Sequence, residues 1–187
     1  MTHIIQQNRV SLKNLKVADF ASEETLCFSA IVLFDGKPIA DARNDGHGGC
    51  TFLHPLKDAQ PRLSDAEVFA KGLPPVVTEY DDPNDRSGKL TIDVTLDFLV
   101  DHIAQETHAN RQIRTAFKRD IAGKVLYIRD NRLLFLKGVK LKEVPDKPRL
   151  FANLRAKHGP AITILNELPQ DEAFVLWKKY AVEGERS

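Results

Sequence analysis

The chain has 187 residues, of which 42% are hydrophobic and 28% are charged, and its formal net charge is +1. This length suits one domain or two small ones and allows roughly 70% of the unfolded chain's surface to be buried; the composition excludes a disordered chain, a collagen and a coiled coil. Two cysteines exclude a dense disulfide framework. Because the start has no secretory leader and no stretch approaches the ~20 apolar residues of a membrane span, we expect a cytoplasmic protein without membrane contact.

The first third of the chain has the pattern of a β-rich region. Residues 9–20 alternate weakly and predict a first strand. Residues 25–34 are apolar on both faces, which predicts a strand that is covered on both sides. Asp35-Gly36 favours a type I′ turn, so we expect a hairpin that returns through residues 38–43. A short strand is expected at 51–53.

Two local sequence patterns mark boundaries in the chain. Ser64-Asp65-Ala66-Glu67 is a capping-box pattern that predicts a short helix ending at Gly72. Residues 73–89 hold three prolines, three aspartates, Asn84 and Gly88, and they predict an exposed linker. We therefore expect a β-rich N-terminal part over 1–72 and an α/β part over 90–187, either as separate bodies or with one shared core.

The apolar period becomes helical from Thr91 onward. Strands and helices do not alternate strictly after this point, so the predicted fold class is α+β with an α-β-β-α-β-α C-terminal part, and one parallel crossover within 148–180 stays open. The predicted elements are helices over 91–103 and 110–121, strands over 124–129 and 132–137 joined by Asp130-Asn131, a helix over 148–157, a strand over 161–165 and a helix over 169–180.

The loop of residues 44–50, which follows the expected hairpin, is the most unusual local segment. Three glycines in four positions allow several backbone N–H groups to point into one space, and such a nest can hold an anion such as phosphate. No Walker sequence or dinucleotide fingerprint is present, and a plain connecting loop is the alternative. The candidate ligand-binding residues are Asn44, Asp45, Gly46, His47, Gly48 and Gly49.

The candidate catalytic residues, His47 and Cys50, lie in the same loop. Cys50 could act as a nucleophile with His47 or His54 as its base, although a small buried apolar cysteine is the simpler interpretation. The spacing of His47, Cys50 and His54 also suits zinc, but no second ligand pair accompanies it, so we expect no metal and no cofactor. Asp93, Asp97 and Asp101 follow at helical spacing and are interpreted as a solvated helix face.

Basic residues concentrate in the segment 111–142, which holds ten lysines and arginines and two aspartates. A basic surface with nearby aromatic side chains, here Tyr127 and Phe135, can bind a nucleic acid or another polyanion. Cations that solubilise strand edges are the alternative. The candidate polyanion-binding residues are Arg111, Arg114, Lys118, Arg129 and Arg132.

Two runs of sequence carry a resemblance. Asn14–Phe28, which leads into Asp35-Gly36-Lys37 and Asn44–Gly49, is the first, and Ile164–Ala173 is the second. Together they resemble uncharacterised small proteins of bacteriophages and other bacterial mobile elements. The resemblance implies an accessory protein that binds host or phage components, and it implies no catalytic residue.

We therefore expect a non-enzymatic binding protein that contacts a polyanionic or acidic partner, either a nucleic acid or a protein. One alternative is a small enzyme that acts on a phosphate-bearing or acyl substrate, with His47 as the acid–base group at the glycine-rich loop. Another is a structural or virion-associated protein without a site. The sequence leaves the oligomeric state open.

Overall fold

The computed structural model describes residues 5–83 and 88–184 and shows a mixed α+β protein. The chain forms two compact units, residues 1–108 (unit 1) and residues 109–187 (unit 2), and each is described by itself below. No helix among the described residues combines the length and the apolar character that crossing a bilayer requires.

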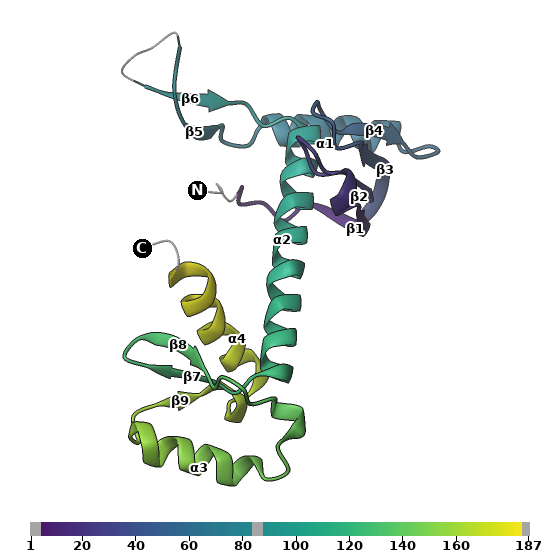
Figure 1. Ribbon diagram of the computed structural model, residues 1–187. Coiled ribbons are helices and arrows are strands. Elements are labelled where there is room, and N and C mark those ends of the chain that lie inside the picture. Colours follow the sequence, from purple (N-terminus) through teal and green to yellow (C-terminus); the bar gives the residue numbers. More distant parts are fainter. Residues whose placement is uncertain (1–4, 84–87, 185–187) are drawn as a thin grey trace. The chain divides into compact units, whose positions relative to one another are not determined.

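Unit 1 is built on a four-stranded antiparallel sheet in the order β1-β2-β3-β4 (Figure 1). Its second turn is the expected hairpin turn. Asp35 and Gly36 have φ values of 48° and 74°, and positive φ at both central residues is what a type I′ turn requires. The strands are β1 (Val10–Val17), β2 (Phe28–Phe34), β3 (Lys37–Asn44) and β4 (Phe52–Pro55).

The core of unit 1 lies on one face of this sheet, where β2 and β3 meet α1 (Gln60–Lys71) and the first half of α2 (Leu96–Gly123). Val32 and Leu99 are fully buried there. The expectation that β2 is covered on both sides is wrong, because Ser29 is exposed and Ile31 and Leu33 are only half-buried. An antiparallel sheet tolerates solvent on one face, so apolar residues on both faces of a strand do not require two covering layers.

The helix α1 (Gln60–Lys71) begins four residues before the capping-box pattern and ends at Gly72 as expected. A proline occupies its first turn, where the missing N–H costs nothing. The predicted start at Ser64 is therefore wrong, since a proline at the first turn specifies a helix N-terminus at least as strongly as a capping box.

Residues 73–89 do not form a plain linker. β5 (Val76–Asp81) and β6 (Lys89–Ile92) pair as an antiparallel hairpin. Residues 84–87 of the expected linker lie outside the described part of the chain. Proline, aspartate and glycine are equally typical of linkers and of hairpin ends, which explains the mistaken interpretation.

A single helix, α2 (Leu96–Gly123), replaces the two predicted helices over 91–103 and 110–121. Its apolar stripe is interrupted over residues 105–112, which are polar apart from Ala109, and the chain divides into its two units at residue 108. The interruption therefore coincides with the unit boundary and not with a helix end. Asp93, which was assigned to the helix face, precedes the helix.

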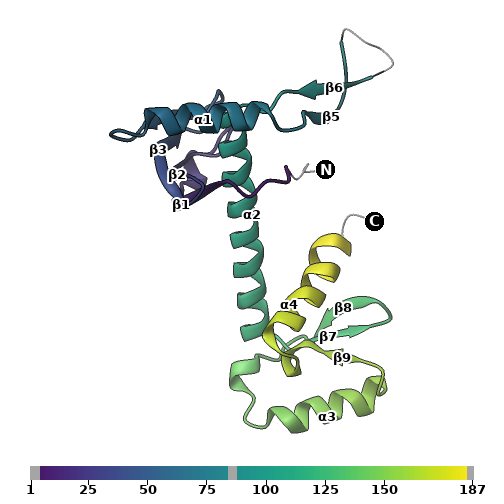
Figure 2. The same ribbon diagram turned by 180° about the vertical axis from the view of Figure 1, so that it is seen from behind.

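Unit 2 is a three-stranded sheet in the order β8-β7-β9 with helices on both faces. α3 and α4 lie on opposite sides of β7 in both views (Figures 1 and 2). Both strand pairs are antiparallel, so the parallel crossover that the sequence allowed within residues 148–180 does not form between the described strands. The elements are β7 (Leu126–Arg129), β8 (Arg132–Phe135), α3 (Lys147–His158), β9 (Thr163–Ile164) and α4 (Gln170–Lys178), after which a π-helical turn (Lys179–Glu183) follows.

The alternation along β7 fills two separate clusters. Tyr127 packs with Phe151 of α3 on one face, and Leu126 packs with Trp177 of α4 on the other. Asn166 connects this sheet to the end of α2: its Nδ2 donates to the carbonyls of Ile121 and Lys124 (3.0 Å each), and its Oδ1 accepts from Leu126 N (2.8 Å).

Candidate functional site

The glycine-rich loop of unit 1, residues 44–50, is organised around a buried asparagine. Asn44 is 2% exposed, and its Oδ1 accepts hydrogen bonds from Thr25 Oγ1 (2.8 Å) and Gly46 N (2.9 Å). Its Nδ2 donates to Thr51 Oγ1 (3.2 Å). The Gly48 amide donates to Thr25 Oγ1 (3.4 Å). Two of the amides expected to line an anion nest therefore already have acceptors within unit 1.

Gly46 is the point where the loop meets the segment before β2. Its carbonyl oxygen accepts from the amides of Glu23, Glu24 and Thr25 at 3.0, 2.9 and 3.3 Å. Its φ is +87°, and a Cβ placed on it would lie 2.0 Å from the Ala21 carbonyl oxygen. A glycine is needed here because no side chain fits this approach, which is a structural role.

No hydrogen bond among the described residues joins His47, Cys50 and His54 into a catalytic triad. His47 is largely exposed, and its Nδ1 lies 3.2 Å from Glu23 Oε2. Cys50 is exposed and is not in a disulfide. His54 lies on β4 and lines a shallow hollow on the outer sheet face together with Lys16 and Arg43. The arrangement supplies no buried nucleophile–base pair.

A hydrogen-bond chain links the loop to α2. Thr51, held by Asn44, donates from Oγ1 to Asp101 Oδ1 (3.5 Å), and Gln105 Nε2 donates to Asp101 Oδ2 (2.5 Å). Burial raises the pKa of Asp101 above its ordinary value, and these hydrogen bonds oppose the rise. Asp101 is half-buried, so it does not belong to the solvated helix face that the sequence predicted.

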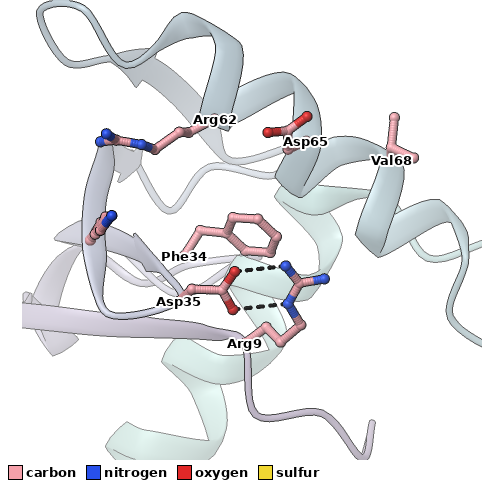
Figure 3. Close-up of a pocket in the computed structure, with 7 residues that line it drawn as sticks. Arg9, Phe34, Asp35, Arg62, Asp65 and Val68 are labelled. Atoms are coloured by element: carbon pink, nitrogen blue, oxygen red, sulfur yellow. Dashed lines mark hydrogen bonds and ion pairs between the residues drawn. The ribbon is translucent and has the colours of Figure 1, made fainter.

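A hollow of about 380 Å³ in unit 1 lies between the β2–β3 turn and α1, and Figure 3 shows its lining. Arg9 donates to both carboxylate oxygens of Asp35 (2.9 and 2.6 Å) and lies 4.4 Å from the centre of the Phe34 ring. The hydrogen bonds from Arg9 lower the pKa of Asp35. Arg62 and Asp65 approach from α1 with opposite charges. The bidentate pair fastens the segment before β1 to the hairpin turn, so it serves the fold.

The two units carry opposite net charge. Residues 1–108 contain 10 basic and 17 acidic side chains, a net charge of −7, and residues 109–187 contain 17 basic and 9 acidic side chains, a net charge of +8. Every described lysine and arginine of unit 2 is exposed or half-buried. The near-neutral total of +1 is thus the difference between an acidic body and a basic one.

The five predicted polyanion-binding residues of unit 2 occupy different places. Arg114 and Lys118 line a hollow of about 220 Å³ beside α4, where the Arg114 guanidinium lies 4.7 Å from the centre of the Phe174 ring. Arg129 donates to His158 Nδ1 (2.8 Å) at the end of the β7–β8 hairpin, and Arg132 is exposed opposite it. Arg111, also exposed, lies in α2.

A larger basic hollow of about 610 Å³ forms where α2 ends. Lys124 lies between this hollow and an exposed ring: its Nζ is 5.3 Å from the centre of Phe135, which is 48% exposed. Three of its cations have acidic partners, since Lys124 and Arg119 lie 2.9 and 3.8 Å from Asp120, and Lys140 lies 2.9 Å from Glu143. The lining residues are Arg119, Asp120, Ala122, Gly123, Lys124, Lys140, Lys142 and Glu143.

The cations of this hollow belong to the basic segment 111–142, but none of them is among the five predicted polyanion-binding residues, and the sequence predicted no hollow. Arg119 and Lys124 lie at the end of α2, whereas Lys140 follows the β7–β8 hairpin. No periodic pattern in the sequence groups these residues, and only the path of the chain after α2 brings them together. The two aromatic residues of the hairpin were treated alike, yet Tyr127 is buried and Phe135 is exposed. Strand alternation separates odd from even positions, but it does not say which face meets solvent.

No protein-family model, curated protein or solved structure matches the chain. Over residues 5–83 and 88–184, no three His, Cys, Asp or Glu side chains are grouped so that they could hold a metal ion. Geometry and charge are therefore the observations from which a function can be argued.

Proposed function

We propose that this protein is a non-enzymatic binding protein whose basic unit 2 engages a polyanionic partner. The observation that carries the proposal is the separation of charge, −7 in residues 1–108 and +8 in residues 109–187. A compact body with such an excess of exposed cations attracts polyanions and releases their counterions when it binds. The proposal includes the accessory role that the sequence resemblance to phage and mobile-element proteins implies.

The ion pairs of unit 2 do not oppose this proposal. Arg119 and Asp120 are 3.8 Å apart, and Arg129 and Asp130 are 3.2 Å apart. One side chain of each pair is largely exposed, Arg119 in the first and Asp130 in the second. Exposed ion pairs of this kind are worth about 0–1 kcal/mol, so a phosphate or sulfate can replace the carboxylate at little cost.

The test is a binding titration with a fluorescent 20-nucleotide deoxythymidine oligomer and with heparin, over a range of salt. If about four phosphates are engaged, the logarithm of the affinity should fall with the logarithm of salt with a slope of about −3. Affinity would then drop roughly 60-fold between about 50 and 200 mM salt. Absent or salt-independent binding of both polyanions would exclude the proposal.

A matched pair of charge reversals locates the interaction. Lys118→Glu/Arg132→Glu/Lys137→Glu, at exposed positions of unit 2, should weaken both ligands at least about tenfold and flatten the salt slope. Lys13→Glu/Lys16→Glu/Lys37→Glu changes charge by the same amount in unit 1 and should have little effect. Equal losses in both triple variants would place the interaction outside unit 2.

A further inference from the structure

One of the cations that line the basic hollow of unit 2 also lies beside an exposed aromatic ring. This cation is Lys124, which lines the hollow and lies 5.3 Å from the centre of the Phe135 ring. The ring ends the edge strand β8 and is 48% exposed. A polyanion without rings, such as a sulfated sugar, would make use of the cations but would not stack on the exposed phenyl ring.

Single-stranded nucleic acid is the polyanion that uses both features. Proteins that bind single strands without sequence preference combine a positive groove for the backbone with aromatic side chains on which bases stack. A duplex hides the faces of its bases inside the stack, and an acidic protein offers carboxylates without flat rings at regular spacing. The dimensions agree, since a hollow of about 610 Å³ is large enough for a nucleotide.

We infer that this hollow binds single-stranded nucleic acid, with a base against the ring of Phe135 and the adjoining phosphates on Lys124, Arg119 and Lys142. The inference rests on the proposed function and adds the ligand class and the place. Asp120 and Glu143 hold Lys124 and Lys140 in the free protein. These acids reduce the net charge of the lining to +2, which is enough for one or two phosphates of a longer strand.

The experiment compares ligands with and without bases on the same variants. Phe135→Leu keeps an apolar side chain and removes the ring, and it should weaken the deoxythymidine oligomer about tenfold while changing heparin affinity less than about twofold. An abasic oligomer of equal length should bind the unmodified protein about tenfold more weakly than the deoxythymidine oligomer, and Phe135→Leu should not weaken it further. This comparison on the unmodified protein does not depend on how well the variant folds.

Two controls separate the ring from the cations and from aromatic exposure in general. Phe52→Leu removes an exposed ring from unit 1, where Phe52 is 57% exposed, and it should leave both affinities unchanged. Lys142→Gln should weaken the deoxythymidine oligomer and heparin by similar factors and make the salt slope less steep by about 0.7.

The outcomes are distinguishable. If Lys142→Gln weakens both ligands but Phe135→Leu and the abasic oligomer behave like their references, the polyanion function stands and the single-strand assignment is overturned. Equal competition by a duplex of the same length would also overturn it. If neither oligomer nor heparin binds in a salt-dependent way, the proposed function itself fails.

Discussion

Unit 1 and unit 2 differ in how many faces of their sheets are covered by helices. In unit 1 the four-stranded sheet is covered on one face, and the other face keeps Ser29 exposed and Ile31 and Leu33 half-buried. In unit 2 the three-stranded sheet is covered on both faces, with separate clusters around Tyr127 and Leu126. The lysines and arginines of unit 2 lie outside these two clusters, along its helices, at the ends of the hairpin strands and in the segment after β8.

The same comparison explains the two asparagines that stand at the centre of local hydrogen bonding. Asn44 in unit 1 organises the glycine loop, and Asn166 in unit 2 bonds the end of α2 to β7. Each donates and accepts through its side-chain amide, which an ionised carboxylate cannot do because it only accepts. Each unit thus depends on one polar side chain that has several partners, and the following predictions examine this dependence.

The largest effect is expected at Gly46 of unit 1. Gly46→Ala places a Cβ 2.0 Å from a backbone oxygen at a φ of +87°, and neither atom can move without displacing the segment before β2. We expect the free energy of unfolding of unit 1 to fall by about 4 kcal/mol or more, measured by urea denaturation. Gly49→Ala is the control, because Gly49 has a φ of +97° and open space around it. It should cost only the backbone strain, about 1–3 kcal/mol; equal losses would contradict the steric role of Gly46.

An intermediate effect is expected from the paired truncations Asn44→Ala and Asn166→Ala. Each leaves buried or half-buried partners without hydrogen bonds, which should cost about 2 kcal/mol. Hydrogen exchange read by mass spectrometry should show the loss of protection in residues 5–108 for the first variant and in residues 109–184 for the second. If either variant lowers protection uniformly across both units, the units unfold as one cooperative body and the comparison between them breaks down.

The smallest effect is expected at Asp101. Its pKa is raised by burial, so the folded state favours the protonated carboxyl more strongly than the unfolded chain does. The associated stability is fully present below the unfolded pKa of about 3.9 and is lost as the pH rises through the folded pKa. Asp101→Asn removes this dependence: relative to the wild type, the variant should gain stability between about pH 4 and pH 7, by less than about 1 kcal/mol. Urea denaturation at the two pH values measures this, and a change of the opposite sign would contradict it.

Local chemistry made some elements of this fold predictable. Asp35-Gly36 and Asp130-Asn131 both have positive φ at their two central residues, and few dipeptides other than these tolerate that conformation. The start of α3 is similar, since the Asp146 side chain accepts from Arg149 N (3.0 Å) and a proline occupies the first turn. The interactions that decide these elements span four residues or fewer, so they can be identified without the rest of the chain.

The candidate site depends on contacts between residues that are far apart in the sequence. The sequence by itself determined an α+β class, two tight hairpin turns, and a cationic segment over 111–142. Only the tertiary structure decided that the units separate at residue 108 within α2, that Tyr127 is buried while Phe135 is exposed, and that Arg119 and Lys142 line one hollow. The physical reason is that periodicity reports which residues share a face, whereas burial and convergence depend on what packs against that face from elsewhere in the chain.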